Sequence, residues 1–215
     1  CAKHFAVHSG PEAIRHEFNA KASKHDMYDT YLYAFKRCVK DAKVEAVMGA
    51  YNRVNGEPAC GSKTLLKDIL RDEFGFEGHV VSDCWAILDF HEHHHVTESV
   101  EESAAMAVNN GCDLNCGSAF LHLQEAYEKG LVSEEAITEA VERLMEVRIR
   151  LGMMKDYPSP YEDITYDKVE CPEHVKLSVE AARRSLVLLK NENAFLPLDK
   201  NKIQTVAVIG PNANS

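Results

Sequence analysis

The sequence predicts an α/β fold, because short apolar runs alternate with longer stretches in which apolar residues recur at helical spacing. Repeated alternation of this kind is typical of parallel strands joined by right-handed helical crossovers. A doubly wound sheet and a closed (β/α) barrel both fit the four strand-helix units of residues 1–152. Since a complete (β/α)8 TIM-like barrel takes about 250 residues, four units would make its second half.

The predicted elements follow one another in a regular order. The apolar runs that we expect to be strands span residues 1–7, 44–50, 79–82 and 111–115. Helical periodicity predicts helices over residues 27–41, 63–74, 99–110, 119–129 and 133–152. In the last helix, Ser133 is placed to cap the first turn and Gly152 to end the final one.

The composition changes after residue 153. Residues 154–172 are rich in Tyr and Pro and have little periodicity, which predicts a linker. A helix is expected over residues 173–190, and the apolar run 206–209 is expected to be the first strand of a second α/β domain. The predicted division is therefore 1–153, 154–172 and 173–215. Because the chain starts inside an apolar run and without Met, we expect it to be an internal piece of a longer protein.

The charge balance excludes some kinds of partner. The chain carries a formal net charge of −10 and has no run of basic residues. Nucleic acids and anionic membrane surfaces need clustered Lys and Arg, so neither is expected as a partner. No apolar run approaches the roughly 20 residues that span a bilayer. With 45% hydrophobic and 27% charged residues, the composition indicates a soluble globular protein.

Seven cysteines are present, and none belongs to a C-x-x-C pair, which argues against a zinc ribbon. We expect mainly free thiols packed as small apolar groups, as in a reducing cytoplasm, with a periplasmic or secreted location left open. Cys60 and Cys84 both follow predicted strands and are expected to be neighbours. Whether these two pair is left open.

The stretch VVSDCWAI, residues 80–87, joins a buried strand to a carboxylate. A buried carboxylate is unfavourable unless it is paired or used, so Asp83 needs a reason to be there. One interpretation is a helix N-cap. The other is a catalytic acid at the mouth of a pocket, with the ring of Trp85 as a platform for a sugar.

Polar residues stand at the carboxyl ends of all four predicted strands. They are Lys3 and His4, then Tyr51, Asn52 and Arg53, then Asp83, and lastly Asp113 and Asn115. In a barrel these strand ends face the active site, so four separate segments would meet there. Lys3 and His4 can donate several hydrogen bonds to a polyol, and a nearby Lys would keep Asp83 ionised. No G-x-S-x-G sequence and no phosphate-binding glycine loop is present.

Histidines 91, 93, 94 and 95 lie together after the third predicted strand. A metal site is one interpretation, but His93 and His94 are adjacent and the order H-E-x-x-H is absent. We favour a polar loop beside the active site. The candidates for a second carboxylate are Glu73, Glu77 and Glu92, of which Glu73 is expected on a solvated helix face.

Four stretches, taken in order, carry a resemblance to a known family. KHFAVHSG, from Lys3, resembles a Lys-His-Phe strand, and MGAYNRVNGEPACGS, residues 48–62, resembles a Met-x-x-Tyr-Asn-x-Val-Asn-Gly-x-Pro segment. LLKDILRDEFGFEGHVVSD, residues 65–83, resembles a Leu-rich helix, Gly-Phe-x-Gly and a strand ending in Ser-Asp. GCDLNCG, from Gly111, resembles a Gly-x-Asp strand. In this order they resemble glycoside hydrolase family 3 over nearly the whole chain.

The resemblance implies a retaining exo-β-glycosidase that releases terminal β-D-xylosyl or β-D-glucosyl units through a covalent intermediate on Asp83. It implies a (β/α)8 barrel followed by a linker and an α/β sandwich domain, whose first strand would be residues 206–209. The family positions around the bound sugar fall on Lys3, His4, Met48 and Tyr51, and Arg15, His16 and Trp85 are also expected to contact substrate. The acid/base glutamate belongs to the second domain and is expected outside this chain, so the isolated chain is expected to be inactive.

Two departures from the family pattern bear on the substrate. Cys84 follows Asp83 where many family β-glucosidases carry Trp, and this resembles the β-xylosidase branch. His16 after Arg15 departs from the loop of the N-acetylglucosaminidases, which disfavours that activity. Xyloside, glucoside and α-L-arabinofuranoside stay open.

The expected partner is an oligosaccharide or an aryl or alkyl β-glycoside, and no metal or organic cofactor is implied. The sequence does not determine the oligomeric state. The rival interpretations are a non-catalytic sugar-binding relative and a metalloprotein that uses residues 91–95.

Overall fold

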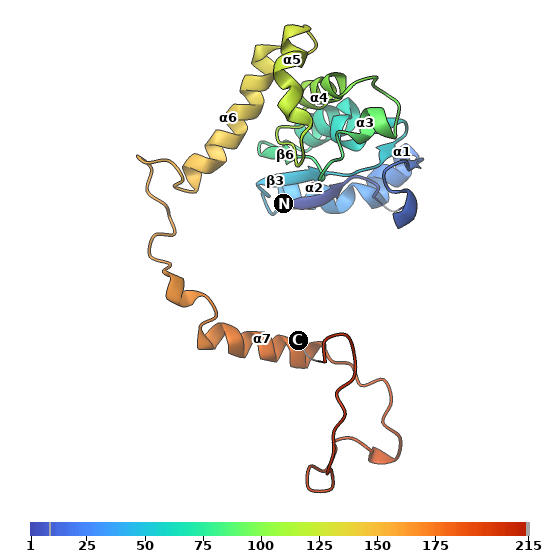
Figure 1. Ribbon diagram of the computed structural model, residues 1–215, viewed down its shortest axis with the longest axis vertical. Coiled ribbons are helices and arrows are strands. Elements are labelled where there is room, and N and C mark those ends of the chain that lie inside the picture. Colours follow the sequence, from blue (N-terminus) through green and yellow to red (C-terminus); the bar gives the residue numbers. More distant parts are fainter. Residues whose placement is uncertain (9, 214–215) are drawn as a thin grey trace. The chain divides into compact units, whose positions relative to one another are not determined.

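The computed structural model describes residues 1–8 and 10–213, which separate into two compact units (Figure 1). The first unit, Cys1–Tyr161, contains two sheets and the helices around them. The second unit, Glu162–Ser215, contains one longer helix and two single helical turns. Within the described residues, none of the helices is both long and apolar enough to cross a membrane.

Three parallel strands form the main sheet of the first unit. They are β1 (Ala2–Phe5), β3 (Ala46–Gly49) and β6 (His79–Val81). β1 pairs with β3 and β3 with β6, so strands that follow one another along the chain are also neighbours in the sheet (Figure 1). A doubly wound sheet reverses its strand order at a switch point, whereas a barrel keeps it. The observed order therefore favours the barrel.

The fourth predicted strand, residues 111–115, is reduced to one parallel bridge between Val81 and Leu114. The backbone N–H groups of Asp113 and Leu114 both donate to the Val80 carbonyl, so the segment does run beside β6. The Val80 N–H, however, donates to the Asp113 side chain at 2.7 Å. Because a side chain takes this backbone donor, the segment stops short of a regular strand.

The core of the first unit packs against one face of the main sheet. Val47 and Val80, which are in register, are completely buried on that face, whereas Lys3, Met48 and Val81 in the next row are exposed or half-buried. At the start of β6 a Cβ on Gly78 would lie 2.2 Å from the carbonyl oxygen of Glu45. Only glycine therefore allows β6 to approach the segment before β3 this closely.

A second, smaller sheet joins the segments that follow β1 and β3. It consists of β2 (Asn19–Ala20), β4 (Arg53–Val54) and β5 (Glu57–Pro58), in that order. β4 and β5 form a hairpin in which both turn residues, Asn55 and Gly56, have positive φ, as two-residue hairpins require. β2 pairs with β4, which brings the loop after β1 next to the loop after β3.

Helices fill the intervals between the strands, close to where helical periodicity places them. They are η1 (Glu12–Ile14), α1 (Lys24–Asp26), η2 (Met27–Tyr31), α2 (Tyr33–Lys40), η3 (Ala59–Gly61), η4 (Thr64–Glu73), α3 (Asp89–Glu92), α4 (Val100–Asn109), η5 (Ala119–His122), α5 (Leu123–Glu128) and α6 (Glu134–Arg150). The hydroxyl of Ser133 accepts a hydrogen bond from the Ala136 N–H at 3.2 Å, so the predicted cap of α6 is confirmed.

Asp113 ties two helices to the main sheet. One carboxylate oxygen lies 2.8 Å from Arg71 of η4 and the other 2.8 Å from Arg143 of α6, while the Val80 N–H donates to the first. The expectation that Asp113 joins the other polar strand-end residues at the site is therefore wrong. Its hydrogen bonds attach η4 and α6 to β6.

The second unit contains η6 (Tyr166–Lys168), α7 (Pro172–Ser185) and η7 (Glu192–Ala194). The predicted helix over residues 173–190 is observed but ends earlier. Residues 206–209 form no strand, and Val206, Val208 and Ile209 are largely exposed. A strand needs a neighbouring strand to satisfy its backbone groups, and none of the residues described in this unit supplies one.

Candidate active site

The carboxyl ends of the three parallel strands bring Lys3, Met48 and Asp83 to one edge of the sheet. Lys3 is in register with Met48, and Met48 with Val81, so Lys3, Met48 and Val81 form a row across the sheet. Asp83 follows Val81 by two residues, the spacing that returns a side chain to the same face. The expected convergence of the first three strand ends is therefore observed.

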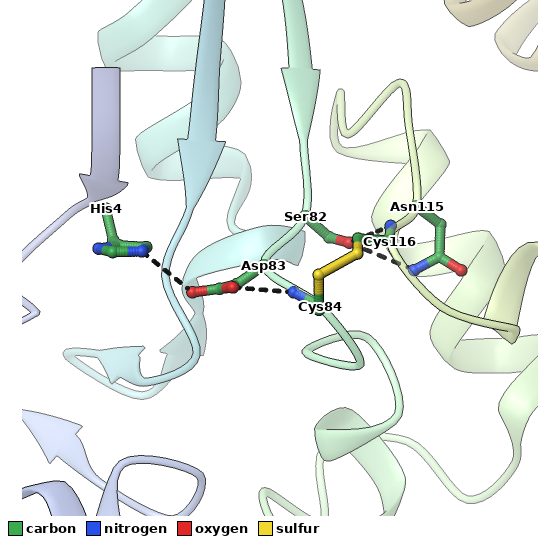
Figure 2. The surroundings of a disulfide bond; sticks show 6 residues. All are labelled: His4, Ser82, Asp83, Cys84, Asn115 and Cys116. Carbon is green, nitrogen blue, oxygen red and sulfur yellow. Dashed lines mark hydrogen bonds and ion pairs between the residues drawn. A yellow bond between two sulfur atoms is a disulfide. The ribbon is translucent and has the colours of Figure 1, made fainter. Parts of the chain in front are cut away.

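Asp83 is a nearly buried carboxylate, 9% exposed. Its Oδ1 accepts a hydrogen bond from the backbone N–H of Cys84 at 2.8 Å, and its Oδ2 lies 3.3 Å from His4 Nε2 (Figure 2). The helix N-cap interpretation is wrong, because the next helix, α3, begins six residues later with Leu88 as its N-cap. Asp83 thus remains a carboxylate at a strand end with few partners.

The charge of Asp83 affects the pKa values of two neighbouring side chains. Burial lowers the pKa of His4, and the negative charge of Asp83 opposes that shift. The pKa of Tyr51 is raised, first by burial and then by the Asp83 charge. His4 rather than Lys3 forms the ion pair with Asp83 among the described residues, while Lys3 is exposed and Met48 half-buried.

Arg15 and His16 both face the ring of Tyr51. The guanidinium carbon of Arg15 lies 4.9 Å from the Tyr51 ring centroid, and the His16 ring centroid lies 4.6 Å from it. His16 Nδ1 is 2.8 Å from Oδ2 of Asp89, which is buried. Asp89 was not among the residues singled out in the sequence. The short Asp-Phe-His order that follows the strand is its only local signal.

A disulfide joins Cys84 to Cys116, so Cys60 and Cys84, whose pairing was left open, do not pair (Figure 2). Cys60 is a free, fully buried thiol whose pKa burial raises to about 12. The hydroxyl of Ser82 accepts hydrogen bonds from the Cys116 N–H and the Asn115 amide, which brings the two loops together. The disulfide also removes the argument for a reducing compartment that rested on free thiols.

Trp85 directly follows Cys84 of this disulfide. Its side chain is 56% exposed, and its backbone N–H donates to the Cys116 carbonyl at 2.6 Å. Its φ is +69°, a left-handed conformation that is rare for an aromatic residue. The ring packs at 3.2 Å from the position that a Cβ on Gly117 would take, so the exposed ring is held against that loop.

The four histidines of the predicted polar loop do not share a common partner. His91 contacts the Ser103 hydroxyl at 2.9 Å, His93 lies 3.7 Å from Asp89, and His95 contacts the His91 carbonyl at 3.1 Å. His94 is buried with neither ring nitrogen hydrogen-bonded. Across residues 1–8 and 10–213, no group of three or more His, Cys, Asp or Glu side chains is arranged to hold a metal ion.

The glutamates considered as a second carboxylate lie elsewhere. Glu73 accepts a hydrogen bond from the Tyr28 hydroxyl at 2.6 Å. Glu92 is exposed and 3.9 Å from His91. Glu77 lines an open polar cavity of about 410 Å³ beside Gly78, at the amino end of β6. None of these contacts involves Asp83.

Comparisons with known proteins agree with this arrangement. The model of the glycosyl hydrolase family 3 N-terminal domain matches residues 1–147. A xylan 1,4-β-xylosidase of Xylanibacter ruminicola is 47% identical over the whole chain, which covers 25% of that relative. A β-xylosidase/α-L-arabinofuranosidase of Medicago sativa subsp. varia is 40% identical, again over the whole chain and 29% of the relative. The chain thus spans about a quarter of the length of these relatives.

Solved structures show the same fold. A GH3 exo-β-xylosidase in complex with a xylobiose aziridine probe matches 93% of this chain and 27% of its own, with a TM-score of 0.85 and 33% identity. A β-glucosidase from Listeria innocua matches 92% of this chain and 28% of its own, with a TM-score of 0.79 and 30% identity. The predicted α/β, TIM-like barrel fold class is confirmed. The chain belongs to glycosyl hydrolase family 3, whose N-terminal domain residues 1–147 match.

Proposed function

We propose that the protein carrying this chain is a retaining exo-β-glycosidase of the β-xylosidase type, with Asp83 as its nucleophile. The observation that carries the proposal is the environment of Asp83. This nearly buried carboxylate follows strand β6, lies 3.3 Å from His4, accepts from the Cys84 N–H and interacts with Tyr51, and among the described residues it has no Arg or Lys ion pair. A buried carboxylate without a fixed cation as its partner is available to react.

The reaction has two displacement steps. In the first, an oxygen of Asp83 attacks the anomeric carbon, the bond from that carbon to the leaving oxygen breaks, and a general acid gives that oxygen a proton. In the second, water attacks the anomeric carbon, gives its proton to the same group, and the ester to Asp83 breaks. The general acid is expected outside this chain.

The contacts of Asp83 suit the nucleophilic role. The Cys84 N–H holds Oδ1, and the disulfide from Cys84 to Cys116 limits the movement of the loop behind it. Oδ2 is left with His4, a side chain that can also donate to a sugar hydroxyl. The carboxylate is therefore oriented without being neutralised.

The names of the relatives favour a pentoside substrate. The Xylanibacter ruminicola relative is named a xylan 1,4-β-xylosidase, and Beta-D-xylosidase 1 of Arabidopsis thaliana is 40% identical over the whole chain. The second candidate is α-L-arabinofuranoside hydrolysis, which the double name of the Medicago sativa relative favours. β-Glucoside hydrolysis comes third, from the name of the Listeria innocua structure.

The test labels the nucleophile in a protein of the relatives' length that carries this chain. The protein is incubated with 2-deoxy-2-fluoro-β-xyloside and 2-deoxy-2-fluoro-β-glucoside probes, digested, and mapped by mass spectrometry. The expected result is one stable adduct on Asp83 that forms faster with the xyloside. Asp83→Asn is the matched control, since it keeps the size of the side chain and should not be labelled.

Other results would overturn the proposal in distinct ways. An adduct on another residue would identify that residue, and not Asp83, as the nucleophile. Hydrolysis with no adduct from either probe would contradict a retaining mechanism at Asp83. Sugar binding with neither adduct nor hydrolysis would favour a non-catalytic sugar-binding protein.

A further inference from the structure

Asp89 is a buried carboxylate next to the site that the proposed chemistry does not use. It opens α3, six residues after Asp83, and is 3% exposed. Burial raises its pKa, and the neighbouring His16 opposes that shift. A carboxylate in such a position requires a partner, and the partner with the shortest contact is His16, whose Nδ1 lies 2.8 Å from Asp89 Oδ2.

The contacts of the His16 ring specify its tautomer. Arg15 Nε lies 3.3 Å from His16 Nε2, and a guanidinium can only donate, so Nε2 must accept. Nδ1 then carries the proton and donates it to Asp89. The ring is therefore held from both sides in one orientation.

The oriented ring of His16 contacts Tyr51, the residue beside the proposed nucleophile Asp83. Tyr51 has the His16 ring at 4.6 Å and the Arg15 guanidinium at 4.9 Å from its ring centroid. The Asp83 charge is among the causes that raise the pKa of Tyr51, so Tyr51 stands within electrostatic reach of the nucleophile. An unbroken series of contacts thus leads from Asp89 through His16 and Tyr51 to Asp83.

We propose that Asp89 is a positioning residue, which fixes the ring and tautomer of His16 so that His16 and Arg15 hold Tyr51 beside Asp83. The proposal rests on the proposed function, since it assigns Asp89 a part in the same reaction. Asp89 itself touches neither substrate nor the reacting atoms. Its shortest contact toward the site is with His16, and through that contact it acts on the position of Tyr51.

If Asp89 acts on the reaction through His16, a double-mutant cycle of these two residues has a specific expected outcome. Asp89→Ala removes the acceptor, and His16→Asn keeps a donor toward Asp89 but removes the ring and Nε2. Each is expected to lower kcat/KM about tenfold, the scale of a misplaced group near the reacting centre. The double variant is expected to lose no more than the worse single variant, because both changes break the same series of contacts.

Two further variants and a comparison of two substrates sharpen the test. Asp89→Asn keeps an acceptor and should recover activity to within about threefold of wild type. His93→Ala removes the more distant neighbour of Asp89, at 3.7 Å, and is the matched control expected to stay within twofold. The loss should be equal for an aryl xyloside and for xylobiose, since positioning does not depend on the leaving group. Melting temperatures show which variants are folded.

The wild-type protein is first labelled at Asp83 as described above, so that failure of the proposed function is seen before any variant is compared. Losses that multiply in the double variant, or Asp89→Ala activity equal to wild type, would overturn the positioning role. A loss in His16→Asn that is much larger for xylobiose than for the aryl xyloside would overturn it too, in favour of proton transfer by His16.

Discussion

Strand β6 lies between two buried aspartates, Asp113 beside Val80 and Asp83 just after the strand, and their surroundings are opposite. Asp113 has two arginines at 2.8 Å and a backbone N–H at 2.7 Å. Asp83 has one histidine at 3.3 Å and one backbone N–H at 2.8 Å. Both are carboxylates in nearly closed surroundings, yet only Asp113 has its charge balanced by fixed cations.

The comparison separates a structural carboxylate from a reactive one. The lone pairs of Asp113 are taken up by permanent partners, so it contributes to the attachment of η4 and α6. Asp83 faces a histidine whose pKa is lowered by burial, and no Arg or Lys among the described residues forms an ion pair with it. Burial alone therefore does not mark a functional acid, whereas burial without compensation does.

The largest expected effect comes from Asp83 itself. Asp83→Asn keeps the volume and the contacts to His4 and Cys84 but removes the nucleophile. We expect kcat in the proposed reaction to fall by at least about 10³-fold, with the melting temperature almost unchanged. Steady-state kinetics and thermal unfolding measure the two effects. If Asp83→Asn kept the wild-type kcat but had a much lower melting temperature, Asp83 would be the structural carboxylate instead of Asp113.

The corresponding change at Asp113 should have the opposite outcome. Asp113→Asn removes the carboxylate charge beside Arg71 and leaves Arg143 with only the exposed Glu139 at 3.3 Å. We expect a loss of about 3 kcal/mol in the free energy of unfolding, with the kcat of the folded fraction close to wild type. Denaturant unfolding gives the first quantity and active-site titration the second. A free energy of unfolding equal to that of wild type would mean that water solvates the two arginines in place of the lost carboxylate.

The disulfide beside Asp83 sharpens the comparison further. It closes a sequence separation of 32 residues, and its removal in Cys84→Ser should lower the free energy of unfolding by about 3 kcal/mol. Cys60→Ser is the matched control, since Cys60 is buried but unpaired. Equal unfolding midpoints for the wild-type protein with and without reductant would contradict a contribution of this bond to stability.

The smallest expected effect concerns pH and His94, a buried histidine that forms no ion pair among the described residues. Burial lowers the pKa of His94 to about 4, below its ordinary value of 6.5. The unfolded chain therefore binds this proton more readily, so the stability contribution is complete above pH 6.5 and is lost as pH falls toward 4. Between pH 7 and pH 5 the loss should be about 2 kcal/mol.

His94→Phe removes this titration and keeps a ring against Phe90. Its free energy of unfolding should fall less than that of wild type between pH 7 and pH 5. His95→Phe is the control, because His95 is exposed. Identical pH dependence in wild type and His94→Phe would show that His94 titrates normally in the folded protein.

Local sequence patterns were sufficient to predict the fold class and part of the candidate site. Alternating apolar runs and helical stretches predicted the α/β fold, and the polar residues after each run predicted that His4, Tyr51 and Asp83 would meet. Both follow from local rules, since strand and helix have distinct periods and parallel strands end at one edge. The resemblance of four ordered motifs added the family, and with it the proposed chemistry.

Only the tertiary structure decided which partners the polar residues have. The sequence placed Asp83 and Asp113 alike at strand ends, and Cys84 had six other cysteines as potential partners. The arginines that compensate Asp113 are 42 and 30 residues away, Cys116 is 32 residues from Cys84, and Asp89 reaches His16 across 73 residues. Such contacts depend on the packing of separate elements, and no local period in the chain encodes them.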